Sequence, residues 1–217
     1  MVEEYVQQIS LWAIPILVAI IFHEVAHGWV AYRLGDPTAA RMGRLTLNPI
    51  SHIDLFGTVL VPLLLIIFRA PFLFGYAKPV PVNFYNLRRP KRDMIWVALA
   101  GPATNILLAF GSILILKLLN SFEFSSFLIA VLDPVALMAT NSVIINVLLA
   151  VFNIFPIPPL DGGRVLVGLL PEPYSSTVAR IEPFGFLIII LLLMTDVLNI
   201  LIGPPIWMVL RIFFSIL

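Results

Sequence analysis

The sequence predicts an all-α protein whose helices cross a membrane several times. Of its 217 residues, 60% are hydrophobic and only 12% are charged, and the mean hydropathy is +1.04. Soluble domains contain roughly 45–50% apolar residues. Several apolar runs approach the roughly 20 residues that a helix needs to cross the hydrocarbon core, and they lack the alternating pattern of a membrane β-barrel. We therefore expect a multi-spanning bundle of membrane helices.

Four apolar runs are long enough to be spanning helices. They cover about residues 8–33, 94–118, 135–155 and 184–202, and a proline-broken apolar tail follows at 204–217. No internal repeat or low-complexity linker separates them. We expect a single domain over residues 1–217, with a core at 8–170 and C-terminal membrane segments at 184–217.

A shorter apolar stretch, residues 55–77, lies between two basic regions. Three arginines at 33–44 precede it, and five basic residues at 78–92 follow it. Because lysine and arginine concentrate in cytoplasmic loops, this pattern favours a re-entrant or interfacial excursion, with a full crossing as the alternative. The first span and the 135–155 span then end at the same cytoplasmic face, and Glu123 and Asp133 lie outside. We expect an integral, multi-pass protein of the cell (plasma) membrane, with its site toward the cytoplasm.

The charge and the cysteine content bound the classes of function. The net charge of +1 gives no reason to expect nucleic acid as a partner. Because cysteine is absent, neither disulfides nor thiolate metal sites can form. The chain begins MVEEYVQQIS, which is acidic where a secretory signal is basic, so we expect the first apolar run to stay in the mature protein.

Three ionisable residues lie within the first predicted span. The stretch HEVAH at 23–27 places two histidines four residues apart, about 40° apart on one helix face. Both imidazoles can reach one metal ion, while Glu24 can accept a proton from a water molecule, as in H-E-x-x-H zinc sites. Counting about 1.5 Å per residue from Arg33, His23 lies roughly 15 Å inside the membrane. Polar groups are costly there, so a purely structural role is the weaker interpretation.

Asp161 is the candidate for a third metal ligand, because catalytic zinc sites use three protein ligands and one open position. It lies in NIFPIPPLDGG, where three prolines prevent regular helix and permit an extended segment along a polar cavity. The predicted topology brings it to the same side as His23. A simple Asp-Gly-Gly turn is the alternative. The remaining histidine, His52, lies in the polar loop LNPISHIDLFG, where a role outside the site is favoured.

Two asparagines lie in apolar helices near these residues. The Asn153 amide could donate to the oxyanion that forms when water attacks a peptide carbonyl, an interaction worth about 2.7–4 kcal/mol in other enzymes. A hydrogen bond to a neighbouring helix is an equally good interpretation. For Asn105, in AGPATN, we expect mainly close helix packing together with Gly101 and Ala103.

Three motifs together resemble the intramembrane metalloproteases of the site-2 protease family. They are HEVAH at 23–27, AGPATN at 100–105 and NIFPIPPLDGG at 153–163, and their order and membrane placement also match. The resemblance covers most of residues 10–170. The loop at 119–134 is too short for the PDZ domain that some members insert, so the chain resembles a minimal member.

The resemblance implies a site and a reaction. One Zn²⁺ per chain would be held by His23, His27 and Asp161, with Glu24 as general base and Asn153 assisting the transition state. Members of the family cut single-pass transmembrane proteins within or beside the bilayer, typically in regulated proteolysis.

The segment KPVPVN resembles the extended edge near the active site of the family. It could bind an unwound substrate as an added strand, and a rigid proline-rich loop is the alternative. The predicted substrate-binding residues are Lys78, Pro79, Val80, Pro81, Val82 and Asn83.

A non-catalytic zinc-binding membrane protein, either a transporter or an inactive protease-like scaffold, is the competing hypothesis. A transporter would need a second ionisable cluster along a path across the bilayer, and Asp196 is the only other ionisable residue deep in a later predicted span. An inactive relative usually lacks the glutamate or a ligand, whereas all four positions are present here. The residues therefore favour a protease.

Overall fold

The computed structural model describes residues 2–68, 75, 77–122 and 125–217, and these residues form helices and loops without a β-strand. The predicted all-α fold class is confirmed. Four helical stretches are long and apolar enough to cross a membrane, at Ser10–Leu34, Pro90–Asn120, Val131–Asn153 and Val197–Phe214. The elements are α1 (Val2–Leu34), α2 (Thr38–Arg41), η1 (Pro49–His52), η2 (Leu55–Leu60), α3 (Val61–Ile67), η3 (Phe84–Asn86), α4 (Pro90–Asn120), α5 (Ser126–Asn153), α6 (Asp161–Leu169), α7 (Tyr174–Ala179), α8 (Glu182–Met194) and α9 (Val197–Phe214).

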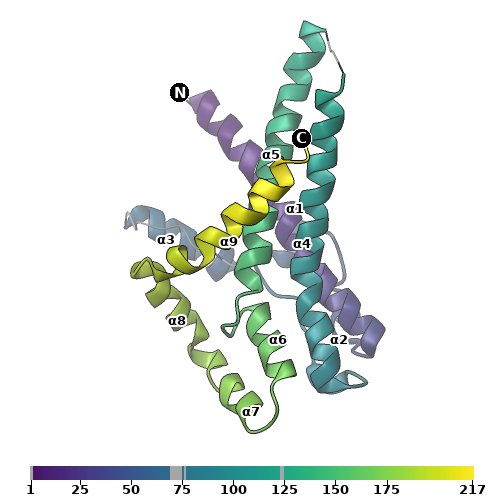
Figure 1. Cartoon of the computed structure of the whole chain (residues 1–217), viewed down its shortest axis with the longest axis vertical. Helices are drawn as coiled ribbons and strands as arrows, with labels where there is room; N and C mark the ends of the chain where they lie inside the picture. Colours follow the sequence, from purple (N-terminus) through teal and green to yellow (C-terminus); the bar gives the residue numbers. More distant parts are fainter. Residues whose placement is uncertain (1, 69–74, 76, 123–124) are drawn as a thin grey trace.

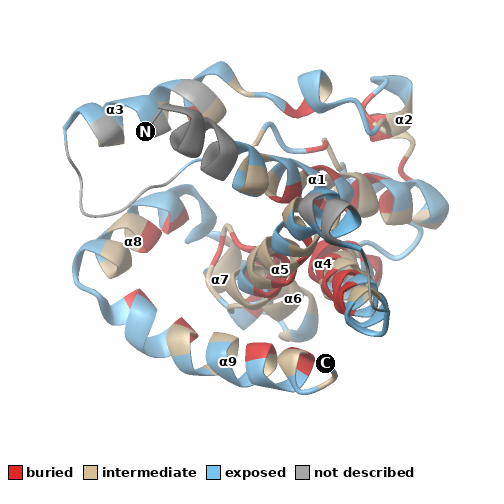
Figure 2. Cartoon of the chain, turned by 90° about the horizontal axis from the view of Figure 1, so that it is seen from above, coloured by how far each residue is buried: buried red, intermediate tan, exposed pale blue. Residues whose placement is uncertain are grey.

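Helices α1, α4 and α5 form the centre of the molecule and pack against one another. In Figure 1, α4 and α5 run side by side along the long axis and α1 crosses them obliquely. The short helices α6 and α7 lie at one end, and α8 and α9 lead back along the bundle. Seen from above, the buried residues concentrate on α4, α5 and the part of α1 beside them (Figure 2).

Mainly small and β-branched side chains of α4 and α5 pack together, and Leu210 and Phe213 of α9 pack against them. Lipid tails are as apolar as leucine, so close packing between helices, rather than the hydrophobic effect, holds a bundle together inside a bilayer. Small residues permit that close approach. The buried cluster consists of Ala109, Ile113, Leu116, Ala139, Val143, Val147, Leu210 and Phe213.

The first three predicted spans are helices, whereas the fourth prediction, 184–202, is wrong. Helix α8 ends at Met194, and Asp196 adopts a left-handed conformation with φ of 59°. Aspartate tolerates this conformation better than most residues, so the chain turns at the polar pair Thr195 and Asp196 between two apolar segments. The 13 residues of α8 extend only about 20 Å, less than the roughly 30 Å of a hydrocarbon core.

The predicted break in the tail at 204–217 is also absent. Helix α9 continues through Pro204 and Pro205 for 18 residues. Gly203 precedes the first proline, and the absence of a Cβ there removes part of the clash that normally excludes the residue before proline from a helix. The long apolar helix at the C-terminal end is therefore Val197–Phe214.

The predicted excursion at 55–77 begins with helical turns. The carboxylate of Asp54 caps them by accepting hydrogen bonds from the backbone N–H groups of Phe56 and Gly57. Residues 69–74 and 76 of this stretch lie outside the described residues, as does Glu123 of the predicted outer loop.

The buried carboxylate of Asp36 joins the end of α1 to the loop that precedes α4. One oxygen accepts a hydrogen bond from the backbone N–H of Asn83, at 2.7 Å, and the other accepts from the side chains of Thr38 and Asn86. Burial alone would raise the pKa of the Asp36 carboxyl, but these hydrogen bonds outweigh it and hold the pKa below its ordinary value of 3.8. The carboxylate thus fixes the segment leading to α4 against α1.

We predict that Asp36→Asn lowers the free energy of unfolding by about 1–3 kcal/mol. Both carboxylate oxygens accept hydrogen bonds, so either orientation of an amide places its NH₂ against a donor. Because the folded-state pKa is depressed, the stabilising contribution is present above pH 3.8 and is lost as the pH falls below that value. Unfolding in detergent at pH 7 and near pH 3 measures both effects.

The exposed Asp133→Asn variant is the control and should stay within about 0.5 kcal/mol of the wild type. Equal stability of Asp36→Asn and the wild type at pH 7 would contradict the role of Asp36.

Candidate metal centre

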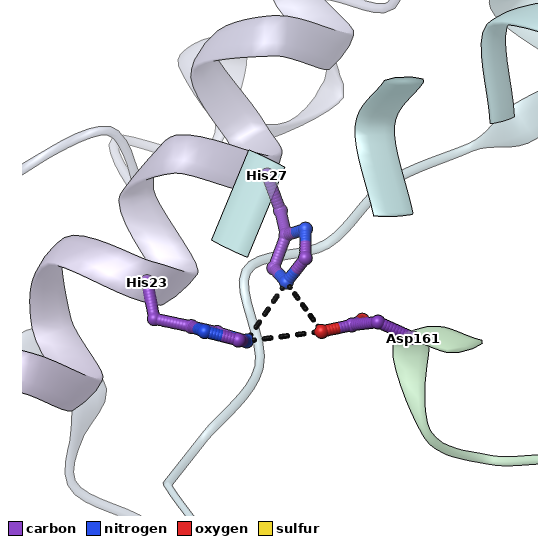
Figure 3. Close-up of side chains that lie close together, drawn as sticks. All are labelled: His23, His27 and Asp161. Atoms are coloured by element: carbon purple, nitrogen blue, oxygen red, sulfur yellow. Dashed lines mark hydrogen bonds and ion pairs between the residues drawn. The ribbon is translucent and has the colours of Figure 1, made fainter. Parts of the chain in front are cut away.

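Three potential metal ligands converge on one point inside the bundle. His23 and His27 come from consecutive turns of α1, and Asp161 is the first residue of α6 (Figure 3). The two Nε2 atoms lie 3.0 Å apart, and Asp161 Oδ2 lies 3.1 Å from His23 Nε2 and 3.3 Å from His27 Nε2. All three residues are buried. Ligands at about 2.0–2.2 Å from a tetrahedral ion lie roughly 3.3–3.6 Å apart, so a small outward movement of the three atoms would let them hold one small cation.

The hydrogen bonds behind the imidazoles determine which ring nitrogen carries the proton. His23 Nδ1 lies 2.6 Å from Asn105 Oδ1, and His27 Nδ1 lies 2.7 Å from the Val97 carbonyl oxygen. Both partners are acceptors, so each Nδ1 must donate. In the neutral rings the lone pairs of both Nε2 atoms therefore face each other and the carboxylate. No hydrogen-bond donor satisfies the buried Asp161 Oδ2.

This arrangement is unfavourable without a cation. With neutral rings, three electron-pair donors lie about 3 Å apart, and in their buried positions their repulsion is screened less than it would be in bulk water. A bound divalent cation would satisfy all three. The chemistry of the donors, two imidazole nitrogens and one carboxylate oxygen, is that of a catalytic zinc site.

The loop before α6 brings Asp161 to the histidines. After α5 ends at Asn153, residues 154–160 turn back and Asp161 begins α6, where the helix dipole favours a negative charge. A Cβ on Gly162 would collide with the Ile154 carbonyl group, and one on Gly163 would lie 2.7 Å from the Ile157 carbonyl carbon. The two glycines therefore allow the first turn of α6 to pack directly on this loop.

A cavity of about 780 Å³ adjoins the three residues. Glu24 and Asn153 line it, together with mainly apolar side chains of α1, α5 and α8. One carboxylate oxygen of Glu24 accepts a hydrogen bond from the backbone N–H of Val80 at 2.8 Å. One N–H of the Asn153 amide bonds to the carbonyl of Leu149, one turn earlier in α5. Both side chains thus border the same space as the candidate ligands.

The predicted substrate-binding segment 78–83 forms part of the cavity wall through Pro79, Val80 and Val82, whereas Lys78, Pro81 and Asn83 do not line it. The segment has no helix, as predicted. Its backbone is not a free edge: the N–H groups of Lys78, Val80 and Asn83 bond to other parts of the chain, and the prolines have none.

Comparison of the sequence with known proteins identifies the family of the chain. The model of the family described as "Peptidase family M50" matches residues 11–142 and 128–195. The chain belongs to peptidase family M50. This confirms the predicted likeness to the site-2 protease family.

Curated relatives of this M50 chain carry consistent descriptions. "Putative zinc metalloprotease YwhC" of Bacillus subtilis is 35% identical over 191 residues, which are 88% of this chain and 83% of that protein. "Putative zinc metalloprotease Rip2" of Mycolicibacterium smegmatis is 30% identical over 84% of this chain and 66% of that protein. "Putative zinc metalloprotease MJ0611" of Methanocaldococcus jannaschii is 28% identical over 77% of this chain and 73% of that protein. No solved structure matches the chain significantly.

Two residues of AGPATN take part in the centre in ways that the sequence analysis missed. Asn105, expected mainly to pack, orients His23 through the hydrogen bond to Nδ1. Gly101 packs against both imidazoles: a Cβ there would clash with His27 Nε2 and would lie 2.6 Å from His23 Nε2. Only glycine at position 101 leaves room for the two rings between α1 and α4.

His52 and Arg44 support the segment 78–83 from behind. The His52 carbonyl accepts a hydrogen bond from the Lys78 N–H, and the Arg44 guanidinium donates to the carbonyls of Lys78 and Pro79. His52 Nε2 donates to the Thr46 carbonyl at 2.8 Å. His52 is buried in the loop and is not one of the three clustered potential ligands.

Gly101→Ala is predicted to weaken zinc binding at least about 100-fold, beyond the usual effect of losing one outer-shell partner. The added methyl group would clash with the His27 Nε2 atom and with the ring of His23, so both rings would have to move. Competition with a chelator in detergent measures the affinity.

Gly111→Ala, in the same helix, is the matched control, because a Cβ there meets no atom within 4 Å. It should keep the wild-type zinc affinity and stabilise α4 by roughly 1 kcal/mol. Unchanged zinc binding by Gly101→Ala would contradict the packing described here.

Proposed function

We propose that this M50 chain is an intramembrane zinc endopeptidase that hydrolyses peptide bonds of single-pass transmembrane proteins within or near the bilayer. The observation that carries the proposal is the meeting of His23 Nε2, His27 Nε2 and Asp161 Oδ2 beside the carboxylate of Glu24 in a bundle of apolar helices. Three protein ligands next to an acid leave one position for water and substrate, as in catalytic zinc sites.

One Zn²⁺ per chain suits this donor set. When bound, it supplies Lewis-acid chemistry, polarising a peptide carbonyl and making a water molecule acidic enough to lose its proton near neutral pH. The chain supplies the rest: His23 and His27 would present their Nε2 lone pairs to the ion, because their Nδ1 atoms donate to Asn105 and Val97, and Asp161 would supply the negative charge.

Glu24 is the general base in this proposal. Its carboxylate faces the cavity next to the ligands, and the Val80 N–H holds one oxygen in place. The proton taken from the attacking water would reside on a Glu24 oxygen and then pass to the leaving amine, because cleavage of a peptide bond requires both transfers.

Asn153 would donate a hydrogen bond to the oxyanion of the transition state. Its amide lines the cavity, and one of its two N–H hydrogens is engaged by the Leu149 carbonyl, which holds the group in orientation. The second hydrogen can serve the oxyanion. The expected contribution is about 2.7–4 kcal/mol.

The apolar wall of the cavity supports membrane segments as substrates. Leu149, Phe152, Phe186 and Ile189 line it from α5 and α8. A substrate helix must unwind there, because its carbonyls are engaged in hydrogen bonds within the helix. Since most N–H groups of the segment 78–83 are occupied, we propose that it contacts the unwound substrate mainly through side chains, with carbonyls of the segment as acceptors.

The distribution of basic residues supports an orientation with the site toward the cytoplasm. The end of α1, with Arg33, lies beside the segment that leads into α4, because the backbone N–H of Arg88 in that segment bonds to the Leu34 carbonyl. Positive residues concentrate on the cytoplasmic side of membrane proteins. We propose a location in the plasma membrane and a role in regulated proteolysis.

The decisive variant is Glu24→Gln. It should keep the zinc content of the wild type while losing on the order of 10²–10⁴-fold in cleavage rate, because the amide cannot accept the proton. Asp161→Ala should lose zinc as well. Metal analysis and cleavage of a single-pass helical substrate, both in detergent micelles, measure these effects.

Glu172→Gln is the control, because the exposed Glu172 does not line the cavity and binds only Lys91, at 3.8 Å, and the backbone N–H of Ser176 among the described residues. It should cleave at the wild-type rate. Zinc binding without any cleavage by the wild type would favour the non-catalytic alternative, and wild-type cleavage by Glu24→Gln would refute the role of the glutamate.

A further inference from the structure

A chain of hydrogen bonds leads from His23 into the apolar centre of the bundle. His23 Nδ1 donates to Asn105 Oδ1 at 2.6 Å, Asn105 Nδ2 donates to Asn146 Oδ1 at 2.8 Å, and Asn146 Nδ2 donates to the Ser142 carbonyl at 2.8 Å. Asn105 on α4 and Asn146 on α5 are each 0% exposed. These hydrogen bonds therefore connect the candidate metal ligand His23, on α1, with helix α5.

The orientation of the Asn105 amide decides which tautomer His23 adopts. With Oδ1 toward the ring, His23 Nδ1 carries the proton and Nε2 is free to bind a metal. With the NH₂ group toward the ring, Nδ1 would have to accept, and the proton would occupy Nε2, where it blocks coordination. An asparagine amide is nearly symmetric in shape, so its surroundings must select one orientation.

Two acceptors make this selection. Asn105 Nδ2 donates to the Ala19 carbonyl at 3.1 Å and to Asn146 Oδ1. The backbone carbonyl of Ala19 is fixed by α1, whereas Asn146 is itself an amide and could present either group. The Ser142 carbonyl, one turn earlier in α5, accepts from Asn146 Nδ2 and so turns Oδ1 toward Asn105.

We propose that Asn146 is a positioning residue for the metal centre, acting through Asn105 to keep the proton on His23 Nδ1. The inference rests on the proposed function, because it concerns how His23 presents Nε2 to zinc. A simple packing role for Asn146 would require only one interhelical hydrogen bond. In this series every donor points the same way, from His23 toward the Ser142 carbonyl, and packing alone does not require such an order.

The structure provides two internal comparisons. His27 Nδ1 donates to the backbone carbonyl of Val97, which cannot reverse, so His27 should not depend on Asn146. Asn141, also on α5, donates to the Leu11 carbonyl of α1 at 3.0 Å and has no bond toward the centre. Asn141→Leu therefore removes an interhelical hydrogen bond of the same helix without changing the hydrogen bonds between His23, Asn105, Asn146 and Ser142.

The test is the affinity of the full chain for Zn²⁺ in detergent, measured by competition with a chelator. We expect Asn146→Leu to bind zinc about tenfold more weakly, at the lower end of the range for outer-shell partners. Asn141→Leu should stay within about twofold of the wild type, as expected for a site that it does not contact. Asn146→Asp should also retain binding, because an aspartic acid kept protonated by the apolar core presents a C=O to Asn105 and an O–H to the Ser142 carbonyl.

Nitrogen NMR of ¹⁵N-labelled histidine gives a second readout, since the chain has only three histidines. In the zinc-loaded wild type, His23 should be protonated at Nδ1. Asn146→Leu should disturb the His23 signals and leave those of His27 unchanged. A proton on Nε2 of His23 in the wild type would overturn the inference even if the leucine variant could not be folded.

The outcomes separate the inference from the proposed function. A wild-type chain that binds no zinc would overturn both. Zinc binding by the wild type with equal affinity in Asn146→Leu, or an equal loss in Asn141→Leu, would overturn the positioning role alone. A loss in Asn146→Asp as large as that in Asn146→Leu would do the same.

Discussion

The central constraint on the structure is that three electron-pair donors, which repel one another, are held close together among apolar helices. Two imidazole nitrogens and one carboxylate oxygen lie 3.0–3.3 Å apart, and the acceptors behind each ring take the Nδ1 proton, so that in the neutral rings the Nε2 lone pairs face the space between them. Such a cluster is costly unless a cation occupies it. The features around the centre keep the donors in place: Gly101 leaves space for the rings, Asn105 sets one tautomer, and the loop before Asp161 turns the carboxylate inward.

A second layer of buried polar groups holds the loops that border the centre. Asp36, Arg44 and the His52 carbonyl bind the backbone around the segment 78–83, and Glu24 binds its Val80 N–H. The segment is therefore fixed from several sides at once. This rigidity would favour the proposed reaction, because a preorganised wall does not have to be ordered when a substrate binds.

The sequence predicted the parts of the centre that follow from local spacing. The two histidines four residues apart and the glutamate between them are visible in one helical turn, and the prolines before Asp161 indicate a loop. The roles of Asn105 and Gly101 depend on how α4 crosses α1, and that crossing has no local signal. The same reason explains the wrong fourth span, since the turn at Asp196 interrupts a run that is apolar on both sides. Hydropathy predicts which segments are apolar, but not where a single left-handed residue redirects the chain.

X-ray absorption at the zinc edge of the purified protein tests the central claim most directly, because it reports the atoms bound to the metal without requiring a substrate. The account predicts one zinc per chain, with imidazole scattering from two histidines and oxygen ligands, all at about 2.0–2.2 Å. The imidazole scattering should disappear when both His23 and His27 are replaced by alanine. Zinc bound without histidine ligands, or bound equally well by that double variant, would contradict the account.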